Sequence, residues 1–339
     1  MKKLKKLLVF LCVFITRILN AQDPSFSQFF SSPLNINPAL TANINADWRA
    51  IANFRDQWIG PASPYVTGTL SYDRKIFQNK IPNVEDEGNV LGIGTMLMYD
   101  RAMGGIVKSN YASLNLSYQV KLSNGDTKHK LAAGFGGIYG HRRIDFSRVD
   151  FEEQFTGYGF NTNLPTGESS LSSMKPYFSI STGLVYSITS ENSNFDIGAA
   201  SFHLNKPRQT FLQDDKQHLA MRNVIHANYE RFLNESLVLN TNAVYQYQSK
   251  AEYYSFGAAL GYFLPNAPEI LLTTGVWYWS DNAIIPYIGV AYEDLQFGLS
   301  YDVTISKLNQ ANEKPKTFEL SLIIRGRTKP TNVIPCPWK

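Results

Sequence analysis

The sequence predicts an all-β protein, a transmembrane antiparallel β-barrel of about fourteen strands preceded by an irregular N-terminal segment. Run after run alternates apolar and polar residues with a period of two, as strands with one apolar face do. Aromatic residues make up 13% of the chain, with 19 Tyr and 21 Phe, and many stand near the ends of these runs. No later apolar run has the length of a transmembrane helix.

The first 21 residues are predicted to be a signal peptide. Lysines at 2, 3, 5 and 6 form a basic start, and Leu7 to Ile15 is an apolar core too short to span a bilayer. Ala21 supplies the small residue for cleavage, so Gln22 is the expected first mature residue. A retained membrane anchor is the alternative, which the short apolar core disfavours.

Export changes the charge argument. The whole chain has 32 basic and 28 acidic residues, a net charge of +4. Residues 1–21 hold five of the 32 basic residues and no acid, which leaves 27 against 28 and a net charge of −1. The mature chain therefore offers no argument for nucleic acid as a partner. Of the two cysteines, Cys12 lies in the leader, so Cys336 has no intramolecular disulfide partner.

Residues 22–46 are predicted to dock on the barrel, at its periplasmic mouth or within its lumen. Three prolines exclude the stretch 23–41, DPSFSQFFSSPLNINPALT, from a sheet ladder. Its many apolar side chains require burial. A loose periplasmic tail is the alternative. The candidate contacts are aromatic anchors and turn-forming residues, namely Phe26, Phe29, Phe30, Asn35, Asn37 and Pro38.

The strands are predicted within residues 47–325, followed by a periplasmic tail, 326–339. In order they span 48–58, 65–73, 90–100, 107–122, 130–140, 177–187, 195–204, 222–232, 237–248, 253–263, 270–279, 284–293, 295–304 and 317–325. Turn signals separate them.

Loop lengths predict the orientation of the barrel. If both termini are periplasmic, connections from even to odd strands should be short turns, and those from odd to even should be longer surface loops. The short turns at 123–126, 191–194, 233–236 and 293–294, and the long loops at 141–175, 205–221 and 305–316, follow this rule. The connection at 74–88 is an exception. A soluble β-sandwich would not explain the asymmetry.

The alternation also separates a lipid face from a lumen face. In the run 107–122, Leu114, Leu116 and Tyr118 fall on one side, and Ser113 and Asn115 on the other. Simple wetting of a water-filled lumen would explain the polar face, and a folded segment inside the barrel is the alternative. The residues expected to face the lumen are Arg49, Asn53, Arg55, Gln57, Asn115, Gln119, Asn240, Asn242, Gln246, Gln296, Ser300, Asp302 and Glu319.

Motifs of catalysis or metal binding are not evident in the sequence. None of the five His has zincin-like spacing, and neither a nucleophile elbow nor a phosphate-binding loop occurs. Glycines such as Gly92, Gly94 and Gly134 lie within strands, which indicates kinks or close backbone approach. We expect no enzyme activity and no cofactor. An outer-membrane hydrolase with a Ser–His pair across loops is the alternative.

Short motifs, taken in order, resemble the PorP/SprF family of outer-membrane proteins linked to type IX secretion. Each is weak alone, and their order along nearly the whole chain makes the resemblance specific. Arg55, Asp100 and Arg101, which lie within these motifs, complete the residues that we predict to contact the plug or a partner. The motifs are DPSFSQF at 23–29 with NPA at 37–39, FRDQW at 54–58, SYD at 71–73, DRAMGG at 100–105, LPTGE at 164–168, HLNKP at 203–207, GLSYD at 298–302, FELSL at 318–322 and CP at 336–337.

This resemblance implies a non-enzymatic barrel in the outer membrane that is surrounded by outer-membrane lipid. Such a protein would assist secretion and surface anchoring of a large adhesin-like protein by holding its C-terminal domain, and would take part in gliding motility. Periplasmic peptidoglycan-associated components would anchor it. A passive porin or small-solute channel is the alternative, and an open lumen would distinguish it.

Overall fold

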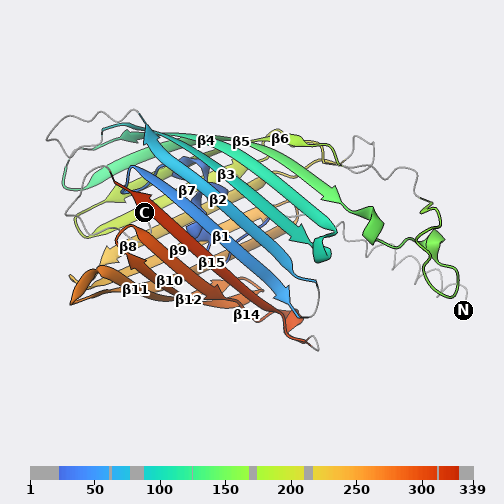
Figure 1. Ribbon diagram of the computed structural model, residues 1–339. Coiled ribbons are helices and arrows are strands. Elements are labelled where there is room, and N and C mark those ends of the chain that lie inside the picture. The colour runs from blue at the N-terminus through green and yellow to red at the C-terminus, as the bar shows by residue number, and fades with distance from the viewer. Residues whose placement is uncertain are drawn as a thin grey trace, which may run out of the picture.

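The protein is a closed antiparallel β-barrel in the computed structural model, which describes residues 23–60, 63–76, 88–123, 125–167, 174–209, 217–310 and 313–327. One 15-stranded sheet follows the chain order and closes where β1 pairs with β15 and β11 with β12 (Figure 1). Strands β13 and β14 are two parts of one stave interrupted at Asp302, so 15 strands make 14 staves. The predicted fold class is confirmed.

The strands lie close to their predicted positions. The largest difference is at β5, which extends beyond the predicted run at both ends. In chain order the strands are β1 (Trp48–Ile59), β2 (Tyr65–Ile76), β3 (Val90–Ala102), β4 (Val107–Lys121), β5 (Lys128–Ile144), β6 (Tyr177–Thr189), β7 (Ser193–Phe202), β8 (Arg222–Phe232), β9 (Leu237–Gln248), β10 (Ala251–Leu264), β11 (Ala267–Trp279), β12 (Ala283–Tyr292), β13 (Leu295–Tyr301), β14 (Val303–Thr304) and β15 (Lys316–Gly326).

The two faces of the barrel wall differ as the alternation predicts. Leu114 on β4 is 56% exposed, whereas its neighbours Ser113 and Asn115 are 6% and 2% exposed. Because successive side chains of a strand point to opposite faces, the exposed set faces lipid and the buried set faces the lumen. Gln57 lines a cavity within the barrel, and the other residues predicted to face the lumen are buried.

The connections divide the barrel into two ends. The short-turn end carries the connections at 122–127, 190–192, 233–236, 265–266 and 293–294, and the long-loop end carries those at 145–176, 203–221 and 305–315. The loop between β5 and β6 contains two short 3-10 helices, η4 (Phe146–Arg148) and η5 (Glu152–Gln154), and projects from the long-loop end (Figure 1). The predicted asymmetry is thus present at these connections. The exception predicted at 74–88 is the long connection from β2 to β3, and its residues 77–87 lie outside the described part of the chain. No helix among the described residues is long and apolar enough to cross a membrane.

Residues 23–46 lie inside the barrel and are called the plug (Figure 1). They form η1 (Phe29–Ser31), α2 (Pro33–Ile36) and η2 (Pro38–Leu40), each of which is too short to fill the lumen alone. Pro33 and Pro38 both stand at helix starts, where their missing N–H groups cost nothing. The sequence predicted that this segment docks either at the periplasmic mouth or within the lumen, and the structure places it in the lumen.

The plug runs the length of the barrel in the opposite sense to β1. Asp23 contacts the long-loop ends of β7, β8 and β9, and Asp47 precedes β1 at the short-turn end, where its N–H donates to Gly326 O. The sequence predicted that the mature chain starts at the periplasmic end. Asp23, the first described residue, lies instead at the long-loop end. The predicted signal peptide, 1–21, and all but 326 and 327 of the predicted tail lie outside the described residues.

Candidate functional site

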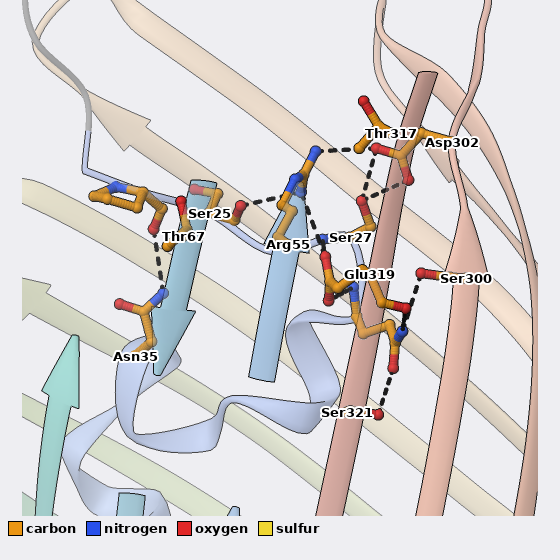
Figure 2. A network of polar contacts seen from close by, with 12 residues as sticks. Ser25, Ser27, Asn35, Arg55, Thr67, Ser300, Asp302, Thr317, Glu319 and Ser321 are labelled. Carbon is orange, nitrogen blue, oxygen red and sulfur yellow. Dashed lines mark hydrogen bonds and ion pairs between the residues drawn. The ribbon is translucent and has the colours of Figure 1, made fainter. Parts of the chain in front are cut away.

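The candidate site is the contact between the plug and the lumen wall. Its centre is Arg55 on β1, which is 1% exposed. The guanidinium NH1 donates to Ser25 O at 3.0 Å, and NH2 lies 3.0 Å from Asp302 Oδ2. Glu319 Oε2 lies 3.6 Å from NH1 (Figure 2). One cation therefore joins the plug to two acids, one on β15 and one between β13 and β14.

The two acids are satisfied mainly by the plug backbone and side chains. Glu319 accepts the N–H groups of Ser27 and Gln28 at 2.8 and 2.9 Å, and Ser27 Oγ donates to Asp302 at 2.8 Å. Gln28 Nε2 donates to Ser300 Oγ, while its Oε1 accepts from Ser321 Oγ at 2.6 Å (Figure 2). Removing the plug would leave these buried carboxylates short of donors, which is costly at low dielectric.

The three aromatic residues predicted as anchors fill two different apolar clusters. Phe26 packs with Leu34, Met96 and Met98. Phe29 and Phe30 pack on the opposite wall, where the Phe30 ring centroid is 4.7 Å from that of Trp277 and 5.6 Å from that of Tyr287. Burial of such side chains contributes about 1.5–3 kcal/mol each. The plug is therefore held between two walls.

The predicted turn residues make specific contacts. Asn37 caps η2, because its Oδ1 accepts the Ala39 N–H at 2.8 Å, and its Nδ2 reaches Leu184 O on β6 at 3.0 Å. Pro38 opens η2. Asn35 O accepts from Arg222 NH2 at 3.0 Å, so both asparagines also tie the plug to the wall.

A row of wall glycines makes room for the plug. A Cβ at Gly134 would overlap the Pro38–Ala39 backbone, and one at Gly183 would overlap the Asn37 amide. At Gly92 a Cβ would stand 2.8 Å from Thr41 O. The close backbone approach predicted for Gly92 and Gly134 is thus an approach to the plug, and only glycine leaves the space.

Asp23 fastens the far end of the plug. Its Oδ2 is 2.7 Å from His203 Nε2 and 3.3 Å from Arg222 Nε, and its N–H donates to Gln248 Oε1 at 3.0 Å. Burial raises the pKa of the Asp23 carboxyl, but His203 and Arg222 outweigh burial and hold that pKa well below its usual range.

His203 also lies 2.7 Å, through Nδ1, from Ser179 Oγ, so Ser179, His203 and Asp23 form a Ser–His–Asp chain. The ring nitrogens are exchanged relative to a serine hydrolase triad, in which the serine bonds to Nε2 and the aspartate to Nδ1. Ser179 is completely buried and does not line the cavity. A substrate carbonyl therefore has no path to its hydroxyl in this conformation, and the three residues act as a latch for the plug.

At the short-turn end, the plug is held by an ion pair between Arg49 and Asp73. Arg49 Nε and NH2 bind both oxygens of Asp73, at 3.1 and 2.8 Å. Asp73 Oδ2 also accepts the Ala42 N–H at 2.7 Å. The bidentate geometry orients the carboxylate for the plug amide. This cluster and those at Arg55 and Asp23 are spread along the whole length of the plug.

Above the plug, at the long-loop end, lies a cavity of about 1020 Å³. Its floor includes Asp23, Pro24 and Ser25, and Trp58 and Trp279 are among the residues of its wall. The plug therefore separates this cavity from the short-turn end.

Asp100 and Arg101, the remaining predicted site residues, are separated by the structure. Asp100 lines the cavity and accepts from Thr67 Oγ1 at 2.7 Å. Arg101, the next residue of β3, points to the outer face of the barrel. Neither residue contacts the plug directly through a hydrogen bond within the described part of the chain.

The sequence prediction missed several residues of the site. Ser27 and Gln28 supply the plug's hydrogen bonds to the acids of the Arg55 cluster, but the sequence shows them only as part of the motif at 23–29. Asp23, His203 and Arg222 come from distant parts of the chain, and no local pattern connects them. The signal that could have found them is the excess of charged side chains predicted to face a lumen, since buried charges need partners.

The family model described as type IX secretion system membrane protein PorP/SprF matches residues 18–324. The chain belongs to the PorP/SprF family. Membership confirms the resemblance seen in the motifs and, with the barrel, places this PorP/SprF protein in the outer membrane. The family also implies membrane-associated secretion partners. No curated protein matches the chain significantly.

Solved structures that resemble this PorP/SprF barrel include a hydrocarbon channel and a porin. A ΔS2 mutant of TodX, a monoaromatic hydrocarbon channel, matches with a TM-score of 0.50 at 9% identity, over 87% of this chain and 93% of that one. The KdgM porin matches with a TM-score of 0.39 at 8% identity, over 81% and 98%. At such identities the likeness to TodX shows the barrel fold alone.

Proposed function

We propose that this barrel is a non-enzymatic component that assists type IX secretion and surface anchoring of a large adhesin-like protein, including in gliding motility. The C-terminal domain of that protein is held at the long-loop end, which faces the cell exterior. Peptidoglycan-associated components contact the short-turn end in the periplasm. Family membership supports this role.

The observation that carries the proposal is the occupied lumen. A passive porin needs a continuous aqueous path, whereas here the plug occupies the lumen below the cavity and is tied to the wall by buried charged clusters at Arg49, Arg55 and Asp23. Such clusters favour one arrangement, because breaking any of them leaves a buried charge without its partner. A barrel built in this way is suited to be a fixed support with loops for a partner.

The experiment is deletion of residues 23–41 behind an intact signal sequence, with two measurements on the same cells and protein. Surface display of the secreted partner should be lost, and conductance of the purified barrel in planar bilayers should rise. Heat-modifiable electrophoretic mobility checks that the shortened barrel inserts. Glu319→Gln, which removes one acid of the Arg55 cluster and leaves the chain length unchanged, serves as a point variant with weaker effects in the same directions.

The porin alternative makes the opposite forecast. A porin would conduct ions readily as the full-length protein, and its removal would slow uptake of small solutes without altering surface proteins. High conductance of the full-length barrel together with normal surface display in its absence would reject the proposed function.

A further inference from the structure

Three cationic side chains stand side by side on the outer surface of the barrel. Arg101 on β3 pairs with Lys108 on β4, which pairs in turn with Arg143 on β5. Their chain neighbours Asp100, Ser109 and Arg142 line the internal cavity. Alternation along the strands therefore points the three cations outward, and we call them the cationic row.

The row is electrostatically unfavourable as it stands. Like charges directly opposite each other on neighbouring strands destabilise a sheet. Asp56 interacts with Arg101 across β2, but among the residues that the structure describes no acid forms an ion pair with Lys108 or Arg143. Within the same described residues, the buried Nε of Arg101 has no hydrogen-bond acceptor.

A fourth cation lies close by. A Cβ built on Gly105, in the turn between β3 and β4, would stand 3.3 Å from Arg101 Cδ and 3.5 Å from Arg148 NH1. Arg148 belongs to η4 of the long loop that follows β5. The loop therefore adds positive charge where the row already has an excess.

Polarity changes in steps along these same three strands. The next outward-facing residues toward the middle of the barrel, Tyr99, Asn110 and His141, form a polar row. Beyond them Leu97 and Tyr139 are more than half exposed, as is Leu114 one step further. The cations therefore border a lipid-facing apolar surface at the long-loop end, where the headgroups of the outer leaflet lie.

We propose that the cationic row binds the phosphate groups of a phosphorylated glycolipid of the outer leaflet. The guanidinium and ammonium groups would contact phosphate, the polar row would meet sugar hydroxyls, and the acyl chains would lie on Leu97, Leu114 and Tyr139. Arg suits this task because its N–H groups match phosphate oxygens. A soluble anion could use the charges but not the adjoining apolar surface, which is why we assign the lipid. The site is independent of the proposed role in secretion.

The test compares two triple variants with the same change in charge. Arg101→Gln, Lys108→Gln and Arg143→Gln remove the row. Arg231→Gln, Lys250→Gln and Lys307→Gln remove exposed cations that lie outside it. Native mass spectrometry of the purified full-length barrels in detergent measures retention of added lipid A, in its phosphorylated and dephosphorylated forms. Heat-modifiable mobility checks folding.

We expect the wild type and the second variant to retain phosphorylated lipid A at least about tenfold more strongly than the row variant does. Dephosphorylated lipid A should bind all three proteins weakly and equally. The proposal fails if the row variant retains the phosphorylated lipid as the wild type does, or if the wild type does not distinguish the two forms. It also fails if millimolar inorganic phosphate displaces the lipid, because the row would then be a site for free anions.

Discussion

Arg55 and Asp302 are 247 residues apart in the chain, and in the lumen the guanidinium NH2 of Arg55 lies 3.0 Å from Asp302 Oδ2. The same guanidinium donates to Ser25 O in the plug. Asp302 interrupts the stave formed by β13 and β14, and its carboxylate also accepts from Ser27 Oγ. The first and penultimate staves of the barrel are therefore joined both directly and through the plug, and folding of the barrel and seating of the plug are coupled.

Arg55→Met is expected to destabilise the barrel by about 3–5 kcal/mol, because it leaves Asp302 and Glu319 buried without their cation. Arg74→Met is the control, since Arg74 is exposed on the adjacent strand β2. Urea unfolding in lipid vesicles, followed by tryptophan fluorescence, measures both. Equal stability of the two variants would show that the Arg55 cluster contributes nothing.

Gly134→Ala is expected to displace the plug while leaving the barrel wall intact. The new methyl group would overlap the Pro38–Ala39 backbone, and η2 cannot shift without breaking the Asn37 contacts to β6 and β7. Conductance should rise, and added protease should cut the plug. Gly68→Ala is the control, because the nearest atom to its Cβ is 3.7 Å away in ordinary contact. A silent Gly134→Ala variant would contradict close packing at this point.

The wall of the barrel could be predicted from the sequence because its determinant is local. Alternation along 107–122 decides which side of β4 faces lipid, because the side chains that contact lipid must be apolar. The lumen could be predicted only in part. Arg55 was expected to point inward, but wetting and plug binding use the same polar residues. The choice between them depends on contacts such as Asp23 with His203, which no spacing in the chain encodes.

The surroundings of Arg101 on the outer surface also could not be predicted from local sequence. The motif that contains it indicated a functional position, and it was grouped with plug or partner contacts. Its true direction follows from the register of β3, β4 and β5, which aligns it with Lys108 and Arg143. Register depends on pairing between strands, and no single strand contains that information.

An arginine introduced on the lipid face should destabilise the barrel, and one introduced on the lumen face should displace the plug. In a barrel with an open lumen the second substitution would have little effect. Leu114→Arg is expected to cost about 2–4 kcal/mol, as a cation in mid-bilayer does. Asn110→Arg, which faces outward nearer the rim, should be milder. Ser300→Arg would be harmless in a wet lumen, but here it removes the contact to Gln28 Nε2 and crowds the Arg55 cluster, so it should unseat the plug. Folding titrations in bilayers rank the three, and conductance separates Ser300→Arg from Leu114→Arg.

The hold of Asp23 on the plug should weaken in acid. Because contacts with His203 and Arg222 keep the folded-state pKa of Asp23 below its unfolded value, its contribution is fully present above about pH 4 and is lost as the pH falls further. That contribution is on the order of 1.5–3 kcal/mol, the range of a hydrogen bond to a charged group. Conductance of the wild-type barrel should therefore rise as the pH at the long-loop side is lowered from about 4 to about 2. Asp23→Asn should already show raised conductance at neutral pH and a smaller change in that interval. Asp126→Asn, in the exposed turn between β4 and β5, should follow the wild type. If Asp23→Asn and wild type had the same conductance at every pH, Asp23 would not be the latch.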